Sequence, residues 1–352
     1  MKVLYGVQGT GNGHITRAIA LTEALTELKS EVDNLEFDMV LSGRPPEPLP
    51  IEANSFTWRQ GLTFITSAGN VQMGKTIMSN NIPRMLMDIR NLDVEGYDVI
   101  LSDFEPIVSW AAKLRGKKSI GIGHQYAFNF NVPMRGEDWL NTTVMRNFAP
   151  ADMAIGLHWH HFDHPILPPI VDIEPDIDRE IERDKVIVYL PFEDAEQVIA
   201  LLKKCPDYQF YVYHPRLVDA DDGNIHRRRT SRVTFKDDLY SANAVICNTG
   251  FELISECLAL GIKIFTKPLA GQVEQLSNGA ALSELDYATV TDNLFLPSIE
   301  KWLKSCRSVR VTYPNVHGCL ARWICNGTKE SVEELAEKMW RDVEVVRSSS
   351  RG

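Results

Sequence analysis

Short runs rich in Val, Ile and Leu alternate with longer amphipathic stretches along most of this chain, and the alternation occurs in two series. The short runs are predicted to be buried parallel strands, and the stretches between them crossover helices. The strands expected in the first series cover residues 2–7, 37–41, 62–65, 99–101, 119–122 and 153–156, and those in the second cover 186–190, 209–213, 233–235, 244–247, 263–266 and 287–290. The sequence therefore predicts an α/β fold with two mostly parallel sheets.

The segment between the two series is punctuated by proline and by acidic residues. Prolines between residues 165 and 169 run into acidic sequence as far as Asp184, and such a composition cannot continue a helix or a central strand. Two domains also suit a chain of 352 residues. We therefore expect a first domain over residues 1–165, a linker over 166–184 and a second domain over 185–327.

The last part of the chain has apolar residues at helical spacing. Val332, Leu335, Met339 and Val343 recur every three or four residues. This spacing predicts an amphipathic helix within residues 328–347.

Charge and apolar content exclude two broad classes of function. Lys and Arg number 37 against 47 Asp and Glu, which gives a formal net charge of −10 and disfavours a nucleic-acid binder, because neutralising phosphates needs a basic face. The apolar runs are far shorter than the ~20 residues of a membrane helix. The apolar stretch before the first glycine turn is also too short for a secretory signal. We expect a cytoplasmic protein with no transmembrane segment, whose six cysteines are free thiols.

A glycine-rich turn, GTGNGH at residues 9–14, follows the first expected strand and opens the first expected helix. In this context glycines let backbone amides approach an anion or a sugar at the helix N-terminus. The turn lacks the lysine of a Walker A loop, and His14 stands where a dinucleotide fingerprint has its third glycine.

His14 and Asp103 are the candidate catalytic pair. A helix N-terminus disfavours an imidazolium and so favours a neutral imidazole that can accept a proton. Asp103 follows an apolar strand, at the sheet edge where open α/β sheets build their sites. An aspartate that orients a histidine is the arrangement that turns a hydroxyl into a nucleophile. Capping or packing for His14, and an N-cap role for Asp103, remain the alternatives.

A second turn lies in the other half of the chain. A strand over residues 244–247 leads into Asn248, Thr249 and Gly250, and a helix is expected from Phe251 to Leu260. Free amides at that helix start would again face a diphosphate.

These segments resemble the GT-B glycosyltransferases from Met1 to about Leu282. The turn at residues 9–14 is similar to the GGTGGH turn of the N-acetylglucosaminyltransferase that makes lipid II. His14 and Asp103 resemble the His-Asp dyad of UDP-glycosyltransferases. Segments 42–45, 61–64, 102–106 and 123–125 look closer still to an archaeal and bacterial branch of this superfamily.

The resemblance implies two Rossmann-like domains across a cleft, with the acceptor bound by the first, the donor by the second, and the terminal helix packed back on the first. It implies inverting transfer of a sugar from a nucleoside-diphosphate sugar, with UDP favoured, to a glycan, lipid-linked or small-molecule hydroxyl, without a bound metal or other cofactor. Glu256 would hold the ribose, and Glu274 and Gln275 the donor sugar. The donor-site residues would be Gly11, Asn12, Gly13, Asn248, Thr249, Gly250, Phe251, Glu252, Glu256, Glu274, Gln275 and Asn278, and the acceptor cleft would include Arg44, Glu105, His124 and Gln125.

Some features leave alternatives open. The family prefers Ser or Thr where this chain has Glu252-Leu253, and Pro where it has Lys263. A hydrolase or 2-epimerase of the same fold and a non-catalytic nucleotide or carbohydrate binder therefore remain rivals. The Met-rich segment 73–92 reads as core packing or as a peripheral membrane contact. The histidines of segment 158–164 read as cleft-lining or solvated side chains, with metal binding as the minor alternative.

Overall fold

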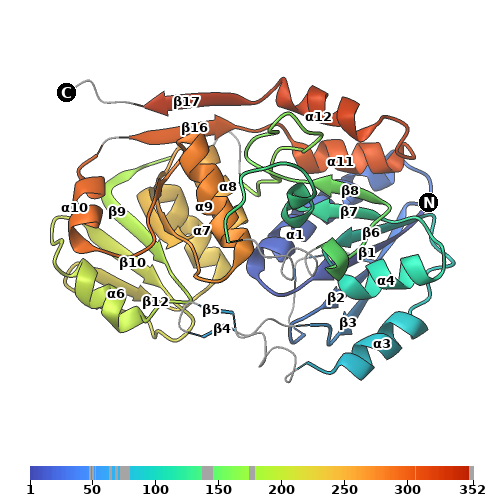
Figure 1. Ribbon diagram of the computed structural model, residues 1–352, viewed down its shortest axis with the longest axis horizontal. Helices are drawn as coiled ribbons and strands as arrows, with labels where there is room; N and C mark the ends of the chain where they lie inside the picture. The colour runs from blue at the N-terminus through green and yellow to red at the C-terminus, as the bar shows by residue number, and fades with distance from the viewer. Residues whose placement is uncertain are drawn as a thin grey trace.

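The computed structural model describes residues 1–46, 49, 51, 53–62, 66–67, 70–71, 80–136, 146–173, 179–305 and 307–348. Two sheets with helices on both faces lie side by side, and the end of the chain runs across both of them (Figure 1).

The first sheet has six strands, all parallel, in the order β3-β2-β1-β6-β7-β8. Successive side chains of β1 point to opposite faces: Val3, Tyr5 and Val7 pack with helix α1, whereas Leu4 packs with α3 and α4. The strands are β1 Lys2–Gln8, β2 Glu36–Ser42, β3 Ser55–Arg59, β6 Val99–Asp103, β7 Ile120–Gly123 and β8 Met153–Gly156. The helices are α1 Asn12–Glu27, α3 Ile82–Asn91 and α4 Pro106–Leu114, with 3-10 turns η1 Leu28–Ser30 and η2 His124–Asn129.

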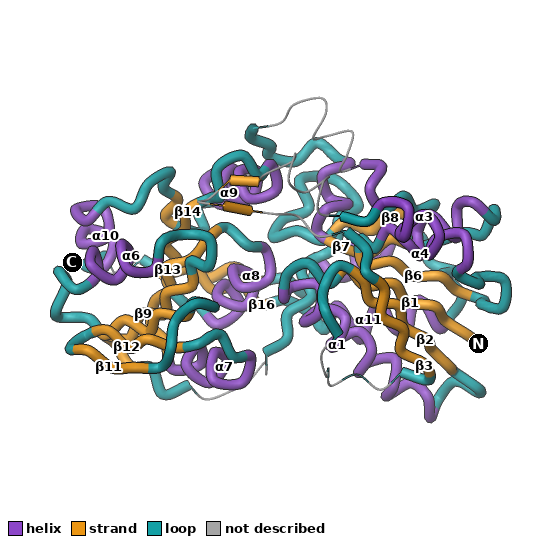
Figure 2. Tube along the Cα trace, turned by 90° about the horizontal axis from the view of Figure 1, so that it is seen from below, coloured by secondary structure: helices purple, strands orange, loops and turns teal. Residues whose placement is uncertain are grey.

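The second sheet has seven strands in the order β11-β12-β10-β9-β13-β14-β15, parallel except for β11. The strands are β9 Glu182–Tyr189, β10 Gln209–Tyr213, β11 Ala220–Asp222, β12 Ile225–Arg228, β13 Ala242–Asn248, β14 Lys263–Lys267 and β15 Thr289–Val290. The helices are α6 Ala195–Leu202, α7 Arg232–Ser241, α8 Phe251–Leu260, α9 Val273–Leu285 and α10 Leu296–Leu303. Figure 2 shows α1 and α8 between the two sheets.

The chain ends in two helices enclosed by two strands. Strand β16 Ser308–Thr312 pairs antiparallel with β17 Glu344–Ser348, and α11 Val316–Cys325 and α12 Val332–Trp340 lie between them in the chain. Helix α11 packs on α1, and the indole Nε1 of Trp340 donates to the carbonyl of Ile166 at 2.6 Å. The terminal helices therefore rest on the part of the chain that carries the first sheet, while β16 rests on α8.

The structure corrects the sequence prediction at four places. Residues 233–235 belong to α7, because Phe235 and the buried Leu239 lie one turn apart on the same helical face. Leu62 lies outside any strand and 63–65 fall outside the described residues; the next strand of the sheet is β3. Residues 344–347 are strand rather than helix, because Val345 and Val346 pair with β16. Strands β3, β11, β12 and β16, and the short strands over residues 66–67 and 70–71, are absent from the prediction.

Within the described ranges, no helix combines the length and the apolar character that crossing a membrane requires. Short strands β4 Thr66–Ser67 and β5 Asn70–Val71 form a separate antiparallel pair.

Candidate functional site

The glycine turn after β1 presents a helix start that no side chain caps. Gly11, the N-cap residue of α1, has a φ of 111°, a left-handed conformation that favours glycine. The turn is held against the first sheet by the amide of Gly9, which donates to the carbonyl of Ser42 at 2.6 Å. Since no side-chain cap is present, the first amides of α1 remain available to a ligand.

The structure brings His14 and Asp103 together. His14 lies in the first turn of α1, and Asp103 is the last residue of β6 and fully buried. The imidazole Nδ1 lies 2.7 Å from the carboxylate Oδ1. With Nδ1 engaged in this way, Nε2 is the ring nitrogen left for an exchangeable proton.

Arg17 completes this pair and is not singled out by sequence reasoning. Its Nε and Nη2 each donate to one oxygen of Asp103 at 2.6 Å, and its side chain is 1% exposed. Nη2 also lies 2.9 Å from Nδ1 of His14. Arg17 follows His14 by three residues, so the two side chains lie on the same face of α1. This spacing is the sequence feature from which Arg17 could have been predicted.

The charges of this cluster stabilise one another. Burial alone would raise the pKa of Asp103, but Arg17 and His14 outweigh burial and hold that pKa below its usual range. Burial alone would lower the pKa of Arg17, whereas Asp103 and then Glu252 raise it above its usual value. Asp103 is therefore a carboxylate, and Arg17 a cation, near neutral pH.

Glu252 reaches this cluster from the second sheet. It lies in the first turn of α8, and its Oε1 accepts from Nη1 of Arg17. Its other oxygen fills the space that a Cβ on Gly13 would need. Glu252, which the sequence analysis assigns to the donor site, thus forms an ion pair with Arg17 in this structure.

The second predicted turn has an uncapped helix start as well. Strand β13 ends at Asn248, and Gly250 is the N-cap residue of α8 with no side-chain cap. The side-chain Nδ2 of Asn248 donates to the carbonyl of Lys267 at 3.0 Å, while its buried Oδ1 has no hydrogen-bond partner. Two uncapped helix starts, at α1 and α8, therefore approach each other where Gly13 meets Glu252.

Three of the residues assigned to the donor stabilise this turn from inside. The Thr249 hydroxyl donates to the carbonyl of Gln275 at 2.8 Å, and the Gln275 side-chain oxygen accepts from the amide of Leu269 at 2.9 Å. Asn278 donates to the carbonyl of Thr249 at 2.9 Å. Gln275 and Asn278 are buried. In this structure their side chains stabilise the turn and do not face an open site. Glu256 and Glu274 are half-buried.

Two of the predicted acceptor residues join the two halves of the chain. His124 is fully buried, and its Nε2 lies 2.6 Å from Oδ1 of Asn278. Gln125 donates to Glu274 at 3.2 Å, and its own buried oxygen has no partner. His124 is thus an interdomain contact rather than part of an open cleft.

Glu105 is not in a cleft either. It is fully buried, caps α4 by accepting from the amides of Ile107 and Val108, and accepts from the Ser42 hydroxyl at 2.6 Å. Burial raises the pKa of this carboxyl to about 7, against the opposing effect of these hydrogen bonds.

Arg44 does line an opening, at the carboxyl ends of β2 and β3. Its Nη1 lies 3.4 Å from Oδ1 of Asn12, next to the glycine turn. The cavity has a volume of about 410 Å³ and is lined by Arg44, Pro45, Pro46, Trp58, Arg59 and Gln60.

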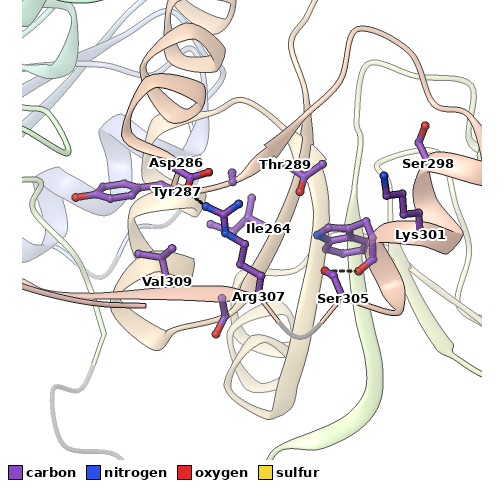
Figure 3. A pocket seen from close by; sticks show the side chains of 12 residues that line it. Ile264, Asp286, Tyr287, Thr289, Ser298, Lys301, Ser305, Arg307 and Val309 are labelled. Atoms are coloured by element: carbon purple, nitrogen blue, oxygen red, sulfur yellow. Dashed lines mark hydrogen bonds and ion pairs between the residues drawn. The ribbon is translucent and has the colours of Figure 1, made fainter. Parts of the chain in front are cut away.

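A second cavity of about 410 Å³ lies between β14, β15, α10 and β16 (Figure 3). An ion pair between Asp286 and Arg307 stands in its lining. None of the predicted site residues lines it. Lys263 donates to the carbonyls of Trp302, Leu303 and Ser305, and so caps the end of α10.

The histidine-rich segment is partly interior. His158 is fully buried, which lowers its pKa well below the usual value, so of the two expected roles, cleft-lining or solvated, it is not a solvated side chain. His160 and His161 accept from nearby backbone amides. Among the residues that the structure describes, no group of three or more His, Cys, Asp or Glu could hold a metal ion.

The described part of segment 73–92 divides between core and solvent. Ile89 is buried and Met85 packs beside it. Leu86 and Met87 are 57% and 56% exposed. Core packing therefore accounts for one face of α3 only, and residues 73–79 lie outside the described residues.

Sequence comparison now identifies the family. A family model described as glycosyl transferase family 1 matches residues 1–306. The chain belongs to this family. The matched range covers both sheets of this family 1 glycosyltransferase and ends just before β16. Proteins with curated descriptions give no match.

Solved structures similar to this family 1 member are glycosyltransferases. The likeness, at identities this low, shows that the chain has the GT-B fold, as the sequence predicts. The glycotransferase of kitacinnamycin shares 12% identity with a TM-score of 0.58, over 97% of this chain and 99% of that one. Spinosyn rhamnosyltransferase SpnG complexed with thymidine diphosphate shares 13% identity with a TM-score of 0.53, over 96% of this chain and 95% of that one. Arabidopsis thaliana UGT89C1 complexed with UDP shares 12% identity with a TM-score of 0.52, over 96% of this chain and 94% of that one.

Proposed function

We propose that this protein is an inverting glycosyltransferase that moves a sugar from a nucleoside-diphosphate sugar to an acceptor hydroxyl, with His14 as the general base. The observation that carries the proposal is the 2.7 Å contact between His14 and the buried Asp103, beside an uncapped helix start. A carboxylate held in this way fixes the imidazole and stabilises the charge it gains.

In the proposed reaction, Nε2 of His14 takes the proton of the acceptor hydroxyl. The oxygen then attacks the anomeric carbon from the side opposite the diphosphate. The bond between that carbon and the diphosphate oxygen breaks, its electron pair leaves with the nucleoside diphosphate, and the anomeric configuration inverts. A positioned base contributes about 10² to 10⁴ fold in rate.

The donor would bind at the two uncapped helix starts. Amides at the starts of α1 and α8 are suited to a diphosphate and need no metal for this role. The unpartnered oxygen of Asn248 and the half-buried Glu256 provide acceptors for sugar or ribose hydroxyls. Two proteins of similar fold hold UDP and thymidine diphosphate, which supports a nucleoside diphosphate; UDP is our first choice.

The acceptor would enter through the opening beside Arg44. This cavity lies next to the glycine turn, since Arg44 reaches Asn12. Replacing Arg44 with Ala should raise the KM of the acceptor and leave the KM of the donor unchanged. An equal effect on both KM values would place the acceptor elsewhere.

Peripheral contact with a lipid surface is a separate part of the proposal. Helix α3 exposes Leu86 and Met87, and Arg84 and Arg90 lie on the same short helix, a combination suited to an anionic membrane surface. Vesicles containing anionic lipid should sediment the protein, and Leu86→Ser with Met87→Ser should abolish this. Val218→Ser, which alters an apolar residue that is exposed elsewhere, is the control.

A thermal-unfolding panel with UDP, dTDP, GDP and CMP tests the donor site. One nucleotide should stabilise the protein selectively, by about 2.7 kcal/mol at 100 times its Kd. Glu256→Ala should remove the shift, and Glu337→Ala, which changes an exposed carboxylate on α12, should retain it. If none of the nucleotides shifts the midpoint, the proposal fails. Binding together with release of free sugar in the absence of any acceptor would favour the hydrolase or epimerase.

A further inference from the structure

The buried cluster around Arg17 draws its charges from both halves of the chain. Arg17 donates to Asp103 at the end of β6 and to Glu252 at the start of α8. Its side chain is 1% exposed, whereas that of Glu252 is 24% exposed. The cation is therefore shared between one carboxylate from each sheet.

Charge balance distinguishes the two protonation states of His14. With a neutral imidazole, the two carboxylates exceed the single guanidinium by one negative charge. With an imidazolium, the four groups are balanced. Were Glu252 absent, Asp103 and Arg17 would cancel each other, and a proton on His14 would have no counter-charge in the cluster.

We infer that Glu252 is a positioning residue for the proposed base: it holds Arg17 from the second sheet and supplies the negative charge that lets His14 keep the proton it takes. This inference rests on the proposed function.

The geometry requires the close approach of α1 and α8. Glu252 occupies the space beside Gly13, the residue that precedes His14, and no side chain would fit there. Nη1 of Arg17 binds Glu252, while Nη2 lies 2.9 Å from His14 Nδ1. The guanidinium thus bonds the carboxylate of one sheet and lies beside the imidazole of the other.

Other titratable groups among the described residues face the cluster from β1 and from the segment after β2. Tyr5, on β1, is buried, and burial together with Asp103 raises its pKa well above the usual value, so it stays neutral. Arg44 reaches Asn12 rather than His14. The same three elements, β6, α1 and α8, therefore carry the nearest charges.

An NMR titration of the histidine side chains tests the inference without any substrate. The His14 resonance is assigned as the one missing from His14→Gln. In Glu252→Gln the pKa of His14 should fall relative to that of wild type, because the cluster loses one negative charge. Glu252→Asp should preserve most of the wild-type value. Glu196→Gln, which removes the carboxylate that pairs with Arg227 at the surface, should leave the pKa of His14 unchanged.

A structural role for Glu252 gives a different result. An acidic residue in the first turn stabilises a helix, so a lower melting temperature with a His14 pKa no different from that of Glu196→Gln would overturn the inference. The proposed function fails separately: if His14→Gln retains the transferase rate, His14 is not the base, whatever its pKa does in Glu252→Gln.

Discussion

The imidazole of His124 lies flat on the phenyl ring of Phe251, with ring centroids 3.9 Å apart and planes at 5°. His124 follows the last residue of β7 in the first sheet, and Phe251 is the first residue of α8 in the second. The contact fixes the start of α8, and with it Glu252, against the part of the chain that carries His14.

This packing predicts a large cost for truncating Phe251. The side chain is 2% exposed, and a Phe→Ala change in a packed interior typically costs about 3–5 kcal/mol. Urea unfolding of Phe251→Ala should show a loss in this range. Phe295→Ala, at a side chain that is 60% exposed, should cost little; equal losses for the two variants would contradict the account.

A methyl group at position 13 should disturb the cluster directly. A Cβ there would collide with the Glu252 carboxylate, so Gly13→Ala should displace Glu252 from Arg17 and lower the transferase rate. Gly96→Ala meets no atom within 4 Å and should keep both rate and melting temperature. Full activity of Gly13→Ala would show that the approach of α1 and α8 is not needed.

The Arg17–Asp103 pair should be costly to break. Removing one partner of a buried ion pair typically costs about 3–5 kcal/mol, because the remaining charge is left uncompensated. Asp103→Asn should show a loss of this size in denaturant unfolding. Asp292→Asn removes the partner of Arg135 in an exposed pair and should change stability little, since exposed pairs contribute little.

Glu105 predicts a pH dependence of stability. Its folded pKa of about 7 lies above the ordinary glutamate value of 4.5, so between these values the native state binds a proton that the unfolded state has released. The contribution of Glu105 to the free energy of unfolding is therefore fully present below pH 4.5. It is lost as the pH rises to 7, which lowers the stability by about 3 kcal/mol. Glu105→Gln should flatten that fall in unfolding free energies measured across the range. Glu95→Gln, in an exposed pair with Lys117, should not.

The core strands can be predicted from the sequence because each is marked by a short apolar run within its own segment. Strands β10 and β8 have the expected bounds, since buried parallel strands read as short apolar runs. Strands β16 and β17 carry no such run: β17 is exposed throughout and is fixed by pairing with residues 32 to 40 positions away. No local pattern reports a pairing of that kind.

The candidate site divides in the same way. His14 and Asp103 are found from turn chemistry and strand ends, which are local features. The partnership of Arg17 with Glu252 joins residues 235 positions apart, and the burial of Gln275 and Asn278 depends on how α9 packs under the turn of β13. These relationships arise from tertiary packing, so the sequence indicates the residues but not which of them face a ligand.

Acceptor-dependent turnover in wild type and His14→Gln is the most direct test of the central claim. Wild type should release nucleoside diphosphate from the selected sugar nucleotide only when a hydroxyl acceptor is present, and the product should have the inverted anomeric configuration. His14→Gln should bind the donor equally well and be slower by about 10² to 10⁴ fold. An unchanged rate in His14→Gln, or a product that retains the donor's configuration, would contradict the account.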